Sequence, residues 1–85
     1  MQQHIYYTKY ALQFADMQIP ELVTVFNRQV NNSGWTGIRA YHDQALIDEF
    51  QRRSIDVSAT YDGKAISFAR HVCYDMADNR LATIN

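Results

Sequence analysis

The chain has 85 residues, the size of one small domain, and we treat residues 1–85 as a single domain. Hydrophobic residues make up 47% of it, with six Tyr and four Phe, which excludes an intrinsically disordered chain. Eight Lys and Arg balance nine Asp and Glu, so no segment forms the basic stripe typical of nucleic-acid-binding proteins.

The sequence also carries a prediction about location. No apolar run approaches the ~20 residues of a membrane span. The N-terminal run MQQHIYYTKY has no basic stretch followed by an apolar one, as a signal peptide would. The single cysteine, Cys73, has no second cysteine in the chain with which to form a disulfide. These features predict a cytoplasmic protein without a membrane segment.

The first element is predicted over residues 4–15. Tyr7, Tyr10, Ala11 and Phe14 follow helical spacing, which favours a helix. The aromatic-rich run IYYTKYALQF also suits a strand, so the strand remains the alternative here. We interpret the tyrosines as core and rim residues, because a base-stacking platform needs more basic neighbours than this segment has.

Residues 18–31 show the clearest helical pattern. Their apolar stripe consists of Ile19, Leu22, Val23, Phe26 and Val30. Pro20 suits the first turn of a helix, and Glu21 complements the positive end of the helix dipole. The run Asn31–Gly34 predicts a stop and a loop. Trp35 follows directly, as a lid over the core edge or as an anchor for a partner.

A third helix is predicted over residues 36–53, with Thr36 or Ser33 as N-cap. Its core stripe is Leu46, Ile47 and Phe50. Ion pairs between positions four apart are expected on its surface, Asp48 with Arg52 and Glu49 with Arg53.

Asp43 does not fit this helix, because its spacing places it along the apolar stripe. In one interpretation the helix begins at Asp43, which is then its N-cap, and residues 37–42 are extended. In the other, the helix runs through and Asp43 pairs with Arg39 in a half-buried site that holds the hairpin or contacts a partner. Either way the carboxylate needs a partner, because an unpaired buried charge is costly.

Residues 55–74 are predicted to form a β-hairpin around a two-residue turn at Asp62-Gly63. Apolar residues alternate on both sides of the turn, and pairing Tyr61 with Lys64 brings Val57 opposite Phe68 on one face. A short third strand over residues 80–84 completes an antiparallel meander. The predicted fold is therefore α+β, with two or three N-terminal helices packed on one face of this C-terminal sheet.

The sequence holds few groups suited to catalysis or metal binding. His71 and Cys73 share a face of a strand, but a structural zinc site needs four ligands, and no further ligand has suitable spacing. The chain contains no phosphate-binding loop and no hydrolase or metalloprotease motif. We therefore expect no metal, no cofactor and no catalytic residue.

Three kinds of function remain open. The first is a small non-catalytic protein-interaction or regulatory module that binds a protein partner or forms a homodimer. Its candidate interaction residues are Trp35, Arg39 and Asp43. The alternative is a winged-helix-like nucleic-acid-binding protein, by analogy of element order, although Asp48 and Glu49 would then face phosphates. The third is an enzyme with a pocket around Arg39, His42 and Asp43.

Overall fold

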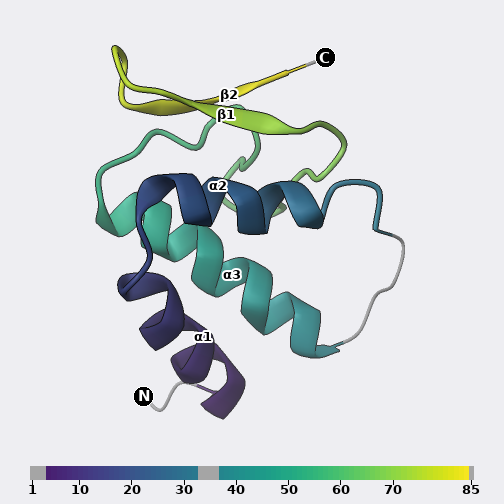
Figure 1. Cartoon of the computed structure of the whole chain (residues 1–85). Coiled ribbons are helices and arrows are strands. Elements are labelled where there is room, and N and C mark those ends of the chain that lie inside the picture. Colours follow the sequence, from purple (N-terminus) through teal and green to yellow (C-terminus); the bar gives the residue numbers. More distant parts are fainter. Residues whose placement is uncertain (1–3, 33–36, 85) are drawn as a thin grey trace.

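A computed structural model describes residues 4–32 and 37–84. The elements in chain order are α1 (Ile5–Ala15), α2 (Ile19–Arg28), α3 (Gly37–Arg52), β1 (Val72–Asp75) and β2 (Arg80–Thr83). The three helices lie on one side of a two-stranded antiparallel sheet, with α2 nearest to it and α1 farthest away (Figure 1). The α+β prediction is confirmed. Within the described ranges, no helix has the length and apolarity needed to cross a membrane.

Helix α1 packs along α3 and buries Phe14, which confirms the helix and rules out the strand. The His4 side chain accepts a hydrogen bond from the Tyr6 backbone N–H and so caps the first turn. The Tyr7 hydroxyl donates to the Asp48 carboxylate on α3. Burial, together with this bond and the neighbouring negative charge, raises the pKa of Tyr7 to about 12.

Glu49 holds Arg53, which joins the end of α3 to the end of α1. Its carboxylate is 5% exposed and accepts from Arg52 and from Arg53, whose Nε lies 2.6 Å from Oε2. Burial opposes the charge, but these hydrogen bonds outweigh it and lower the pKa of Glu49. Arg53 Nη2 also donates to the Met17 carbonyl oxygen at 2.6 Å. The Glu49–Arg53 pair is therefore confirmed, whereas Arg52 pairs with Glu49 instead of the expected Asp48.

The first turn of helix α2 contains Pro20 and Glu21, as predicted. The Glu21 side chain accepts from the Gln18 backbone N–H at 3.0 Å, and Pro20 lies in the first turn. Leu22 and Phe26 are fully buried on the face turned toward the core. The core residues form one cluster of Phe14, Leu22, Phe26, Val30, Ala45, Leu46, Ile47, Phe50, Ile55, Val57, Val72 and Leu81.

The predicted hairpin over residues 55–74 is wrong as a regular element. The segment between α3 and β1 makes two isolated bridges, Tyr61–Ile66 within itself and Asp56–Arg80 with β2, and the second of these is parallel, so there is no antiparallel meander. Local hydrogen bonds explain the difference. The Asp56 carboxylate accepts from the Ser58 N–H, and the Thr60 and Tyr61 N–H groups donate to the Val57 carbonyl. Such turns compete with a strand ladder.

The turn at Asp62-Gly63 also differs from the prediction. Tyr61 is bridged to Ile66 instead of Lys64, which leaves a four-residue loop over residues 62–65. The Asp62 carboxylate accepts from the N–H groups of Lys64 and Ala65, each at 2.8 Å, and within residues 62–65 only Gly63 has a positive φ, of 96°. The Asp62 side chain thus stabilises the loop, where a type I′ turn would need positive φ at both central residues.

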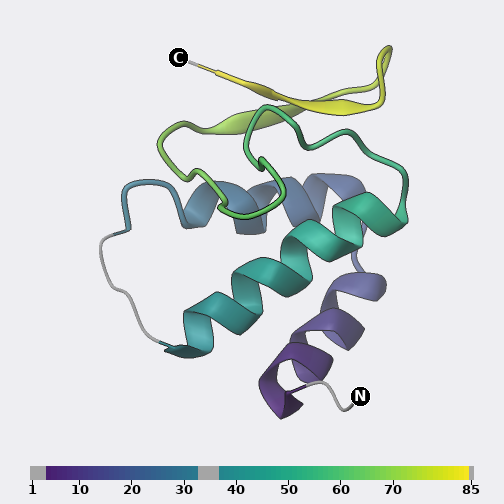
Figure 2. The same ribbon diagram turned by 180° about the vertical axis from the view of Figure 1, so that it is seen from behind.

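The apolar face of this segment is nevertheless covered. Val57 is 4% exposed, and the Phe68 ring packs on Phe26 with centroids 4.8 Å apart. Figure 2 shows the chain between α3 and β1 lying against α2 and α3. The regular hairpin is formed instead by β1 and β2, paired in the register Val72–Thr83 through Asp75–Arg80. β2 confirms the predicted strand near residues 80–84, and it buries Leu81.

Candidate functional site

Of the three candidate interaction residues, the structure brings Arg39 and Asp43 together. Helix α3 runs through Asp43, so Asp43 is not the N-cap of the helix. Arg39 Nε lies 3.3 Å from Asp43 Oδ2, and Asp43 is 3% exposed. Trp35 falls outside the described residues, as do the predicted N-caps Ser33 and Thr36.

Arg39 also connects α3 to the end of α2. Its guanidinium donates to the Asn32 carbonyl at 2.7 Å and to the Gln29 carbonyl at 3.2 Å. It lies over the Phe68 ring, 5.4 Å from the centroid. One side chain therefore joins α3, the chain after α2 and the segment before β1. These contacts are those of a residue that holds elements together.

His42 completes this cluster. Its Nδ1 lies 3.0 Å from Asp43 Oδ1, and its ring packs edge-on against Tyr10 and Phe14. Both carboxylate oxygens of Asp43 are therefore engaged. A depression of about 340 Å³ lies beside the cluster, lined by Ala40, Asp43, Gln44, Lys64, Ala65, Ile66 and Phe68. Asp43 is thus held by Arg39 on one oxygen and by His42 on the other.

His71 and Cys73 are both exposed near β1. Among residues 4–32 and 37–84, no three His, Cys, Asp or Glu side chains are grouped closely enough to hold a metal ion. Neither residue is therefore part of a larger ligand set in that part of the chain.

A surface that the sequence did not indicate lies between α2 and β1. It is an apolar groove of about 670 Å³, hereafter the α2–β1 groove, lined by Ile19, Pro20, Val23, Val72, Cys73, Tyr74 and Met76. Met76 is 79% exposed at its end. Ile19 and Val23 belong to the stripe assigned to the core, yet both are only partly buried. Their incomplete burial could not be predicted, since it depends on where a strand some fifty residues later comes to lie.

The outer edge of β1 borders this groove. The Asn27 side chain pairs with both backbone polar groups of Val72: Nδ2 donates to the carbonyl at 3.0 Å, and Oδ1 accepts from the N–H at 2.8 Å. The Val72 groups therefore point away from β2. Along a strand of an antiparallel pair, the backbone groups of successive residues point alternately toward and away from the partner strand. The N–H and C=O of Tyr74, two residues after Val72, therefore also point away from β2. In the described part of the chain, no side chain bonds to Tyr74 as Asn27 bonds to Val72.

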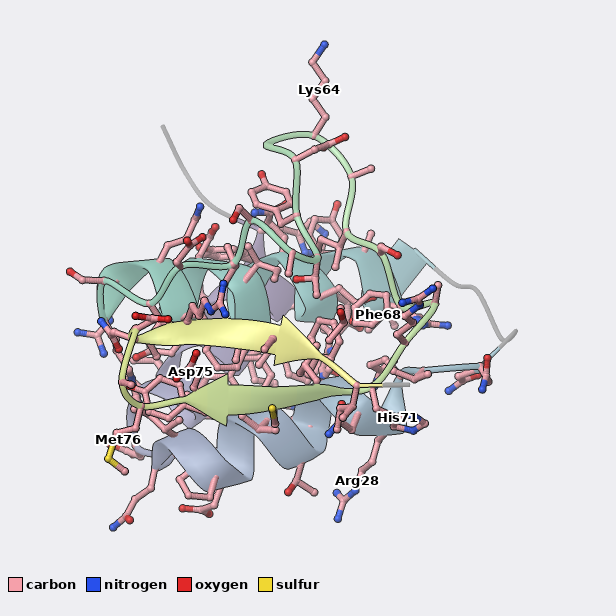
Figure 3. The ribbon with its side chains drawn as sticks, turned by 90° about the horizontal axis from the view of Figure 1, so that it is seen from above. Arg28, Lys64, Phe68, His71, Asp75 and Met76 are labelled. Atoms are coloured by element: carbon pink, nitrogen blue, oxygen red, sulfur yellow. The ribbon has the colours of Figure 1, made fainter. Side chains whose placement is uncertain are left out.

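Charged residues of opposite sign lie near the two ends of β1, beside the groove. Figure 3 shows Asp75 and Met76 at one end of β1 and His71 with Arg28 at the other. Helix α2 runs alongside in the opposite direction, since Ile19 and Pro20 line the groove together with Met76, whereas Asn27 bonds to Val72. The groove is thus apolar along its length, with Asp75 near its Met76 end and Arg28 near the end at His71.

Comparisons of the chain with protein-family models, with curated proteins and with solved structures found no match.

Proposed function

We propose that this protein is a small non-catalytic interaction module that binds another protein chain. The α2–β1 groove is the observation that carries the proposal. It is open and apolar, and it ends in Met76, a flexible side chain of the kind enriched at protein interfaces. Large apolar surfaces left exposed on small proteins mark sites of contact with partners.

The burial of α3 weighs against the nucleic-acid alternative. A recognition helix has to present one full face to the major groove. Helix α3 is packed against α1, and six of its residues are buried, including Asp43 and Glu49. Glu49 and Arg52 are also joined to each other, so this end of α3 offers little positive charge for phosphates.

The proposal is tested with a photo-crosslinking amino acid placed at single positions in the full chain. Met76 probes the groove, Ile5 probes a second exposed apolar position on α1, and Gln13 is an exposed polar control. The proposal expects a discrete protein adduct in the source cell from Met76 or Ile5 and none from Gln13. Equal labelling at all three positions, or none at either apolar position, would contradict it.

A second measurement separates the nucleic-acid alternative. Affinity for duplex DNA that falls steeply with added salt, together with the absence of protein adducts, would replace the proposed function with that alternative.

A further inference from the structure

We infer that the α2–β1 groove binds an extended segment of a partner protein, which adds to the sheet as a strand antiparallel to β1. This inference rests on the proposed function and specifies the chemistry of the partner. It follows from the backbone groups at the β1 edge, from the apolar floor and from the charges at the two ends.

Tyr74 presents its backbone groups at the edge of β1. Its N–H and C=O point away from β2, beside the groove. They lie two residues along β1 from the Val72 groups that bond to Asn27. An extended peptide supplies a donor and an acceptor in this arrangement, which is how strand addition to a sheet edge works. The carboxamide of Asn27 already imitates such a peptide at Val72. It also ends the ladder there, so the added strand is short.

The apolar floor determines which side chains the segment needs. The residue opposite Tyr74 shares its face of the sheet and therefore points toward α2. There it meets Ile19, Pro20 and Val23, the apolar side of the groove. An apolar residue is required at this position, and its two neighbours point to the opposite face of the sheet.

The end charges orient the segment. β1 runs from the end near His71 and Arg28 toward Asp75 and Met76 (Figure 3). An antiparallel segment runs the other way, so its N-terminal part lies near Asp75 and its C-terminal part near Arg28. Charge complementarity therefore favours a basic residue before the apolar position and an acidic residue after it.

A second copy of the chain fits this groove less well than a separate segment. Two β1 strands paired antiparallel are related by a two-fold axis perpendicular to the sheet. Helix α2 projects past the β1 edge (Figure 3), so this symmetry brings both α2 helices beneath the same pair of strands. An extended segment without a helix of its own avoids that conflict.

The test is a selection of short random peptides displayed on phage, with the full wild-type chain as bait and the Met76→Glu variant as counter-selection. The expected peptides carry a basic residue, then an apolar residue within an alternating pattern, then an acidic residue. Binding of such a synthetic peptide should slow hydrogen exchange of the Tyr74 amide about tenfold or more, because that N–H becomes bonded. Arg28→Glu should weaken binding about threefold to tenfold, whereas Lys9→Glu, the same charge change on α1, should leave it unchanged.

Three outcomes would overturn the inference. The first is a selection that enriches nothing, or peptides that bind Met76→Glu equally well. The second is unchanged exchange at Tyr74 in the peptide complex. The third is protection of Tyr74 that rises with protein concentration alone, with sedimentation as a dimer, which would make a second copy the occupant. A protein adduct at Ile5 but not at Met76 would remove this inference and leave the proposed function standing.

Discussion

Asn27 and Val72 are bonded twice, with the carboxamide of a helix residue taking the place of a neighbouring strand. Nδ2 donates to the Val72 carbonyl at 3.0 Å, and Oδ1 accepts from the Val72 N–H at 2.8 Å. Val72 is 1% exposed, so these groups have little access to water as a substitute. The pair is the polar connection between α2 and β1, and it sets how the sheet sits on the helices.

Replacing Asn27 by Ala should therefore destabilise the protein by about 2–3 kcal/mol, because it leaves the buried N–H and C=O of Val72 without hydrogen-bond partners. Urea unfolding measures this cost, and hydrogen exchange of the Val72 amide should accelerate in the variant. Asn27→Asp keeps the acceptor and loses the donor, so it should also destabilise the protein. Thr24→Ala, an exposed position on the same helix, serves as the control and should change stability by no more than about 0.5 kcal/mol.

The Arg39–Asp43 pair is expected to act on stability. Asp43→Asn removes a buried negative charge beside Arg39 and should cost about 2–3 kcal/mol in unfolding experiments. Asp16→Asn, the same change at an exposed position, should be nearly neutral. A partner-binding role without a bracing role predicts the reverse result, with unchanged stability and lost binding, and that result would restore Asp43 as an interaction residue.

Ser54 ends α3 in a conformation that favours glycine. Its φ is 62°, and the Ile55 N–H bonds to the Phe50 carbonyl at 3.0 Å while the Ser54 N–H bonds to the Gln51 carbonyl at 2.9 Å. This is the Schellman arrangement, in which a left-handed residue follows the helix. Ser54→Gly should raise the unfolding free energy by about 0.5–1 kcal/mol. Gln51→Gly, three residues earlier within the helix, should lower it by about 1 kcal/mol.

Ionisation of Tyr7 should lower the stability of the folded protein at alkaline pH. The pKa of its phenol is raised from 10.0 to about 12, first by burial and then by the hydrogen bond to Asp48. A raised folded-state pKa favours the neutral form, so its contribution is complete below pH 10 and is lost as the pH rises toward 12. The Tyr7→Phe variant should lose less stability in this window, as followed by unfolding at successive pH values.

The partner of Tyr7 offers a separate check. Asp48→Asn removes the negative charge but leaves the burial, so the phenol should ionise at a lower pH that is still above its ordinary value. Tyrosinate absorbance reports this change. An identical titration in the Asp48→Asn variant and the wild type would contradict the assigned cause.

The three helices were predictable from sequence because each is defined by a local repeat. The stripe containing Leu22 and Phe26 specifies α2, and the one containing Leu46 and Phe50 specifies α3, without reference to the rest of the chain. The contact between Arg39 and Asp43 was predictable for the same reason, since positions four apart are neighbours on any helix. The lack of a basic stripe and of catalytic motifs in the sequence narrowed the possible classes of function. It did not locate the α2–β1 groove.

The strands depended on more than alternation. Residues 55–61 alternate as a strand does, yet the side chain of Asp56 and the carbonyl of Val57 bind nearby N–H groups and fold the segment into turns. Residues 72–75 became a strand because β2 and Asn27 lie on either side of it. The α2–β1 groove likewise arises where Val23 and Tyr74 come together across fifty residues. Local hydrogen bonds and helical periodicity depend on neighbouring residues, so they can be predicted from the sequence. A strand partner or a groove wall comes from a distant segment, and its position is decided only when the chain packs.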